Sequence, residues 1–319
     1  YVSLRLGPML LTQHAFSITS NTVIRRVKRQ TMHWSAILVP FFAFGFQKAT
    51  GWKPWKINHK FCGYADSEPA ARIVHGELIN RTAMPWIVRL EMRTANYLYH
   101  CAGSIITDRV ILTAAHCLSI PNEDILDVTV YFNSTTRDWG PTLLGKKMII
   151  HPQYNSTLIA NDVAMLKVNE KIMFQRWFLP VCLPTRNRTY ISQFYLIGGW
   201  GRTSQSGPSS PELLRAHITL MPQEACQRFL NRTKKRFVNI ESLVCGDTRY
   251  GDFCKGDSGG PLTGFKDEKH SEQIGIVSSS FGCGNPGVPS MFMRVSYFMP
   301  WIKKELRRQA CWKRIGSPE

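Results

Sequence analysis

The chain has 319 residues, 44% of them hydrophobic, which supports a sizeable core and excludes a disordered chain. Its formal net charge is +18, and a surplus of this size can indicate a polyanionic partner such as nucleic acid. Six basic residues and no acid lie within 1–51, so the remainder keeps 34 basic against 22 acidic residues, or +12. That remainder shows no run of Lys and Arg with interleaved aromatics. We expect a solvated basic surface first and a site for anionic glycans second.

The first long apolar run is SAILVPFFAFGF at 35–46. It is about a dozen residues long, whereas a membrane-spanning helix needs roughly 20. Ala43 and Gly45 form the small-residue pattern of a signal-peptidase site. We expect translation to start at Met32, so that 1–31 is upstream sequence and 32–51 is a signal peptide. The alternative is a short signal-anchor with Arg25–Arg29 on the cytosolic side, which would leave the protein membrane-associated.

We expect 52–72 to be a short pro-segment and 73–310 to be one all-β domain, followed by a tail at 311–319. Short runs rich in β-formers recur and are broken by Gly, Pro and Asn. The clearest of these runs lie at 86–92, 104–114, 127–132 and 274–280.

One helix is expected near the end of the chain, where apolar residues recur at helical spacing. The apolar face carries Phe298, Trp301, Ile302 and Leu306, and the basic residues Lys303, Lys304, Arg307 and Arg308 lie off it. We expect this face to dock on the core.

Nine cysteines and five glycosylation sequons point to an oxidising, secretory route. No C-x-x-C pair is present, so the usual zinc spacing is missing. Unused sequons in a cytosolic protein are the alternative. A secretory route contradicts a nucleic-acid module. The sequons begin at Asn80, Asn133, Asn155, Asn187 and Asn231.

Three segments together carry the chemistry: TAAHC ending at Cys117, NDVAML from Asn161, and GDSGGP from Gly256. A serine hydroxyl needs a base to become a nucleophile at neutral pH, and the base needs a carboxylate to fix its tautomer. We expect His116, Asp162 and Ser258 to fill these three roles. The glycines beside Ser258 let a substrate carbonyl approach the backbone. The N–H groups of Gly256 and Ser258 can then stabilise the oxyanion.

In these motifs and their order, the sequence resembles the trypsin-like serine proteases from Ile73 to about Arg308. The resemblance implies two six-stranded antiparallel β-barrels of the chymotrypsin type, with the triad in the cleft between them and a C-terminal α-helix. It implies no cofactor. No calcium or other metal is expected, because the stretch 129–139 holds Asp138 as its one acid and carries the Asn133 sequon.

The resemblance also assigns the cysteines. It pairs Cys101 with Cys117, Cys226 with Cys245, Cys254 with Cys283, and Cys62 with Cys182. The last pair would hold the pro-segment to the catalytic domain after cleavage. A further bridge of the family is missing at both ends, where Tyr195 and Gly264 stand. Cys311 is left over.

The junction Arg72-Ile73-Val74-His75-Gly76 resembles the family's activation site, with His75 in place of the commoner Gly. Cleavage after Arg72 would free the amino group of Ile73. The resemblance implies that this group turns inward and pairs with Asp257, which shapes the oxyanion hole. An exposed loop Arg without such a role is the alternative.

The expected substrate pocket departs from the family pattern. Asp252 stands where trypsin-like members hold the carboxylate that pairs with substrate Arg or Lys. Beside it, Phe253 replaces a small residue, and its direction decides whether long basic side chains reach Asp252 without strain. Ser278 belongs to the expected pocket. Ser279 replaces the Trp of the cleft wall, and Ser280 and Ser290 replace two glycines.

These features predict a secreted serine endopeptidase made as a zymogen, with basic specificity and reduced efficiency. The alternative is a pseudoprotease that keeps the triad but binds with a blocked pocket. Expected partners are protein or peptide substrates, an activating trypsin-like protease, and protease inhibitors or anionic glycans.

Overall fold

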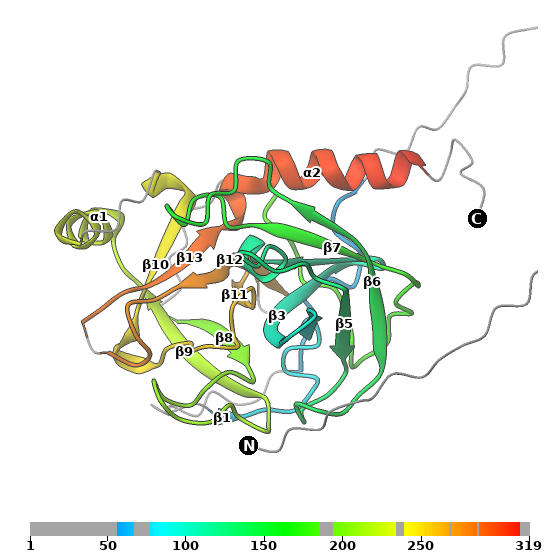
Figure 1. Ribbon diagram of the computed structural model, residues 1–319, viewed down its shortest axis with the longest axis horizontal. Helices are drawn as coiled ribbons and strands as arrows, with labels where there is room; N and C mark the ends of the chain where they lie inside the picture. Colours follow the sequence, from blue (N-terminus) through cyan, green and yellow to red (C-terminus); the bar gives the residue numbers. More distant parts are fainter. Residues whose placement is uncertain are drawn as a thin grey trace, which may run out of the picture. The chain divides into compact units, whose positions relative to one another are not determined.

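A computed structural model describes residues 56–66, 77–185, 194–233, 239–267, 270–285 and 287–312 (Figure 1). The expectations about the start of the chain, the signal segment, the Arg72–Ile73 junction and the Asn187 sequon fall outside these residues. So does any statement on the side chain of Cys311.

The first half of the domain is a closed six-stranded antiparallel barrel. Its strands neighbour one another in the order β2 (Ile87–Arg93), β3 (Leu98–Thr107), β4 (Val110–Thr113), β7 (Ala164–Val168), β6 (Thr142–Ile150) and β5 (Asp127–Phe132). β5 pairs back with β2 and closes the ring. The inward positions of β2, β4 and β7 carry large apolar residues, and burying them drives closure.

The second half is a barrel of the same kind. It follows the order β8 (Tyr195–Gly199), β9 (Leu214–Leu220), β10 (Leu243–Asp247), β13 (Ser290–Arg294), β12 (Ser271–Ser279) and β11 (Pro261–Phe265). β8 pairs with both β9 and β11 and closes the ring, while the short β1 (Glu77–Leu78) adds to β9. The domain is therefore the pair of six-stranded barrels that the sequence resemblance implied.

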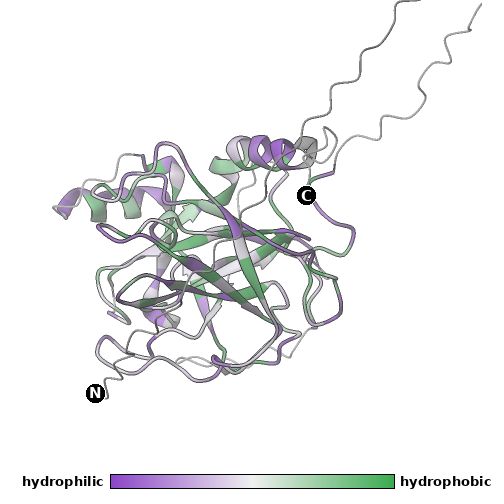
Figure 2. Ribbon diagram, turned by 45° about the vertical axis from the view of Figure 1, so that its right-hand side comes forward, coloured by the Kyte–Doolittle hydropathy of each residue, from purple (hydrophilic) through white to green (hydrophobic). Residues whose placement is uncertain are grey.

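Two helices and three short 3₁₀ turns complete the fold. They are α1 (Gln223–Arg232), α2 (Val295–Trp312) and the turns Ala115–Cys117, Ile240–Ser242 and Thr248–Tyr250. In α2, Phe298, Ile302 and Leu306 are buried, so the predicted docking face is confirmed. Figure 2 shows that both hydrophobic and strongly hydrophilic residues occur along this helix. No helix in the described ranges is long and apolar enough to span a bilayer.

The structure divides one predicted strand and adds one helix. The run 104–114 is split between β3 and β4 by a turn at Asp108 and Arg109, which the apolar pattern alone does not show. α1 was not expected, although Cys226 and Leu230 lie four residues apart on its buried face. α2 extends to Trp312, past the expected start of the tail.

The four disulfides that the resemblance implied are present: Cys62–Cys182, Cys101–Cys117, Cys226–Cys245 and Cys254–Cys283. At the site of the absent bridge, an aromatic ring packs on a glycine. A Cβ added to Gly264 would lie 2.7 Å from two ring carbons of Tyr195. Contact between β8 and β11 thus replaces the missing covalent link.

Candidate active site

His116 and Asp162 come together at the adjacent ends of two paired strands of the first barrel, β4 and β7. His116 lies in the 3₁₀ turn that follows β4, and Asp162 lies two residues before β7, which pairs with β4. Nδ1 of His116 is 2.8 Å from Oδ2 of Asp162, and the backbone N–H of His116 donates to Oδ1 at 2.8 Å. The carboxylate, 1% exposed, therefore orients the imidazole through both of its oxygens.

The charges of this pair stabilise one another. Burial by itself lowers the pKa of His116, but the Asp162 carboxylate outweighs it, and the pKa is raised above 6.5. For Asp162, burial raises the pKa, but the charge of His116 and hydrogen bonds from His116 and Ser278 hold it below its ordinary value. This arrangement can stabilise a protonated His116.

Ser258 lies on the loop before β11 of the second barrel and is bonded across to the first. Its carbonyl accepts from the Ala102 N–H of β3 at 2.7 Å. Gly259, at φ +79°, lies so close to Thr113 and Ala102 that an added Cβ would overlap both. Among the described residues, no group is hydrogen-bonded to the Ser258 hydroxyl. Such bonds often form only when substrate is bound.

Two backbone N–H groups at Ser258, its own and that of Gly256, have no acceptor among the described residues. Gly256 adopts φ +105°, a conformation that favours glycine. These two N–H groups are the pair that the sequence assigned to the oxyanion hole.

Asp257 is half-buried and has no cation partner among the described residues. Its carboxylate accepts from the N–H groups of Gly201 (2.7 Å) and Cys254 (3.0 Å). Burial raises the pKa of Asp257 to about 6. Gly199 and Gly201 leave room for the carboxylate, since a Cβ at either position would overlap it. The carboxylate borders a cavity of about 390 Å³ between the Ile197–Gly201 segment and β9.

Asp252 borders the same cavity and is held by three donors. Gly284 N–H donates to one oxygen at 2.7 Å, Phe253 N–H donates to the other at 2.8 Å, and the hydroxyl of Ser290 also donates to it. Burial nevertheless raises the pKa of Asp252. Ser290 is 0% exposed and is not among the residues that line this cavity, so its side chain holds the carboxylate and does not narrow the pocket.

Two expected pocket residues point elsewhere. Phe253, 4% exposed, packs edge-on against Phe292 with ring centroids 5.3 Å apart, inside the core of the second barrel. It is nevertheless among the residues that line the cavity bordered by Asp252. The hydroxyl of Ser278 donates to Asp162 Oδ2 at 2.6 Å, so this side chain belongs with the His116–Asp162 pair. Ser279 and Ser280 are partly exposed at the end of β12.

Of the described sequon asparagines, Asn80, Asn155 and Asn231 are exposed. Asn133 is only partly exposed, and its side-chain oxygen is buried without a hydrogen bond, which fits poorly with an attached glycan.

Comparison with known proteins agrees with this geometry. The family model described as Trypsin matches residues 73–302. The venom serine protease Bi-VSP of Bombus ignitus is 32% identical over 261 residues, which cover 78% of this chain and 71% of that protein. Melanization protease 1 of Drosophila melanogaster is 32% identical over 268 residues, which cover 74% of this chain and 66% of that protein. Serine protease grass, also of Drosophila melanogaster, is 30% identical over 256 residues, which cover 72% of this chain and 67% of that protein.

Proposed function

Since the chain belongs to the trypsin family of serine proteases, we propose that it is a secreted endopeptidase, made as an inactive precursor, that cuts after Arg or Lys. The observation that carries the proposal is the double hydrogen bond between His116 and Asp162, with Ser258 held to the same barrel through Ala102.

In the proposed reaction, Nε2 of His116 takes the hydroxyl proton of Ser258 while Oγ attacks the scissile carbonyl. The carbonyl oxygen becomes negative and is bound by the N–H groups of Gly256 and Ser258. Asp162 stabilises the imidazolium that forms. His116 then gives its proton to the leaving amine, and water hydrolyses the acyl-enzyme by the same route.

Basic specificity is supported by Asp252 and by the orientation of Phe253. A partly buried carboxylate favours a ligand that supplies the opposite charge. The packing of the Phe253 ring on Phe292 in the barrel core supports an approach to Asp252 that this ring does not block. A pseudoprotease with a blocked pocket is the alternative that the test below addresses.

Activation by cleavage is supported by Asp257. A half-buried carboxylate that borders a cavity, with no cation partner among the described residues, is suited to receive a new amino terminus, and the Arg72–Ile73 junction would supply one. The Cys62–Cys182 disulfide would keep the pro-segment attached afterwards. Secretion is supported by four disulfides and exposed sequons.

The test combines an active-site label with a peptide library. The protein cleaved after Arg72 should react with a fluorophosphonate probe, and Ser258→Ala and uncleaved Arg72→Gln should not. The cleaved enzyme should cut after Arg and Lys, and Asp252→Ser should lose this preference. A folded, cleaved protein that takes no label would disprove the catalytic proposal. Efficient cutting after large apolar residues would disprove the specificity alone.

A further inference from the structure

Two exposed cations, Lys255 and Arg202, lie beside the loop that carries Ser258. Lys255 stands between Cys254, which is bridged to Cys283, and Gly256, whose N–H belongs to the proposed oxyanion hole. The carbonyl of Lys255 accepts from the Arg202 N–H at 2.9 Å. This bond holds the two backbone segments side by side, so their side chains start from neighbouring points on the surface.

The segments that carry these cations are also packed together at the edge of the substrate site. A Cβ added to Gly256 would lie 3.0 Å from the Cα of Gly201. Arg202 lines the cavity that Asp252 borders. Both Arg202 and Lys255 are exposed. Because the backbone of each is held in place, both charges stay within a side chain's length of the proposed oxyanion hole.

Neither cation forms an ion pair in the described part of the chain. The two acids nearest to Lys255 in the sequence are engaged elsewhere. Asp252 and Asp257 both accept from backbone N–H groups, and Asp252 also accepts from the hydroxyl of Ser290. Both positive charges are therefore available to a ligand.

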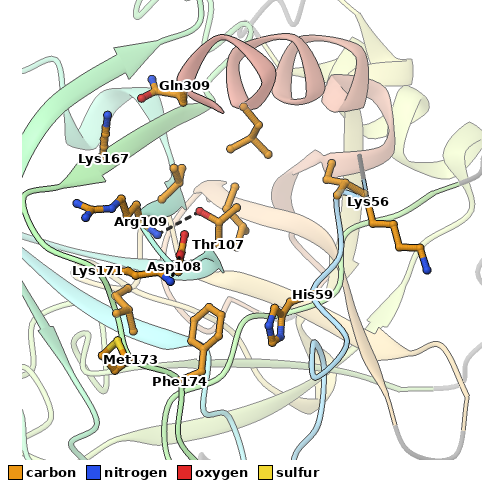
Figure 3. Close-up of a pocket in the computed structure, with 15 residues that line it drawn as sticks. Lys56, His59, Thr107, Asp108, Arg109, Lys167, Lys171, Met173, Phe174 and Gln309 are labelled. Carbon is orange, nitrogen blue, oxygen red and sulfur yellow. Dashed lines mark hydrogen bonds and ion pairs between the residues drawn. The ribbon is translucent and has the colours of Figure 1, made fainter. Parts of the chain in front are cut away.

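Basic side chains in another cavity show the contrast. This cavity, of about 400 Å³, lies where the first barrel meets α2, and there Lys171 pairs with Asp108 at 3.1 Å (Figure 3). Arg109 of the same cavity donates to the Asn169 carbonyl at 3.0 Å. A carboxylate of a ligand would compete with partners that the protein already supplies in that cavity, whereas it would meet no such competitor beside the loop of Ser258.

The substrate site thus has a negative charge in its cavity and two positive charges at its edge. The proposed function assigns the basic side chain before the cut to Asp252. Because the scissile carbonyl must reach the Gly256 N–H, the residues that follow the cut pass close to Lys255. A carboxylate at those positions is attracted by two cations, whereas a second basic side chain is repelled.

We propose that Arg202 and Lys255 select substrates with Asp or Glu in the first two positions after the cut. The inference rests on the proposed function, and it narrows the substrates to chains in which an acid follows the Arg or Lys. Exposed ion pairs contribute modestly in water, so we expect about a tenfold preference for Glu over Lys at these positions. Salt should weaken the preference, because it screens exposed charges.

The test uses the enzyme cleaved after Arg72 and peptides that differ only in carrying Glu, Gln or Lys at the two positions after the cut. In Arg202→Gln with Lys255→Gln, the ratio of kcat/KM for the Glu and Lys peptides should fall from about ten to about one, and Arg202→Glu with Lys255→Glu should reverse it. The control is Arg228→Gln with Lys304→Gln, exposed positions on α1 and α2. It loses the same charge and should keep the ratio of the unmodified enzyme.

An equal fall in the control would show attraction by the overall net charge and would overturn the inference. Equal cutting of the Glu and Lys peptides by the unmodified enzyme would also overturn it and would leave the proposed function intact.

A cleaved protein that cuts none of the peptides would count against the proposed function instead. Binding of the same peptides to Ser258→Ala, measured by fluorescence anisotropy, then decides the inference. Tighter binding of the Glu peptide that is lost with Arg202→Gln and Lys255→Gln supports it, and equal binding of the Glu and Lys peptides overturns it.

Discussion

At the scale of single residues, the Asp162 carboxylate sets the protonation of its histidine partner. It contacts both the ring and the backbone of His116, and Ser278 fixes the carboxylate in turn. The proposed mechanism needs His116 neutral before attack, and the pKa of His116 is raised above 6.5. The pH at which activity appears therefore reports directly on this contact.

We expect kcat/KM of the cleaved enzyme to fall as pH drops through the raised pKa of His116, because the protonated ring cannot act as a base. Asp162→Asn removes the charge that raises this pKa, so the acidic limb should move to lower pH and kcat should fall about 10⁴-fold. Ser278→Ala should cause a smaller loss. Kinetics from pH 5 to 9 measure both effects, and an acidic limb that stays in place in Asp162→Asn would contradict the assignment.

Phe253 gives a second test at this scale. The sequence left the direction of Phe253 open, whereas in the structure the ring packs on Phe292 in the core. The substitution should instead lower the free energy of unfolding by about 3–5 kcal/mol and leave kcat/KM no higher. Phe253→Leu, which keeps most of the volume, should cost less. Denaturant titration of both variants measures the loss of stability, and peptide kinetics measures kcat/KM. Faster cutting by a stable Phe253→Ser protein would refute the placement of this ring in the core.

At the scale of elements, β8 and β11 are joined by packing where relatives with the further bridge have a covalent link. The Tyr195 ring covers Gly264 closely enough that no side chain fits there. A contact of this kind fixes the spacing of two strands through shape alone. It is sensitive to a single added methyl group.

Gly264→Ala should therefore destabilise the protein by about 1–3 kcal/mol through overpacking. The same substitution should cost as much in a Tyr195→Phe background, which keeps the ring. In a Tyr195→Ala background the penalty should disappear, because the added methyl group then has room. Urea unfolding of these variants measures the coupling, and a penalty independent of the ring would show a different cause.

How far the sequence predicts these elements depends on what each prediction needs. Motifs of fixed spacing located His116, Asp162 and Ser258, and helical spacing located α2. The direction of Phe253 was left open, although successive side chains of an extended segment alternate, and Asp252 beside it faces the cavity. The partner of Ser278 lies 116 residues away and has no local signal. The turn at Asp108 was not predicted, because it contains no Gly or Pro and lies within an otherwise apolar run.

At the scale of the whole molecule, Asp257 connects stability to cleavage. Its pKa is about 6 in the folded chain, against about 3.9 for an ordinary aspartate, so the folded state binds more protons between these values. The free energy of unfolding should then fall as pH rises from 4 to 6, by an amount on the order of 2 kcal/mol from this group.

The measurement is urea unfolding at pH 4, 5 and 6 for the uncleaved protein and for Asp257→Asn. Other carboxylates contribute equally to the two proteins. The difference between their slopes of unfolding free energy against pH therefore reports the contribution of Asp257. Cleavage after Arg72 should also reduce the slope, because a new ammonium group beside Asp257 lowers its pKa. Identical slopes in wild type and Asp257→Asn would show that this carboxylate is not the cause.

The bond from Ala102 to the carbonyl of Ser258, with Gly259 packed against Thr113, has a consequence for inactivation. Ser258, the proposed nucleophile, is part of the second barrel, yet its backbone is bonded to the first. Heat that merely parts the two barrels would separate the serine from the histidine while each barrel kept its strands. Loss of turnover on warming should thus precede loss of the far-ultraviolet circular dichroism signal, and it should reverse on cooling while both barrels remain folded.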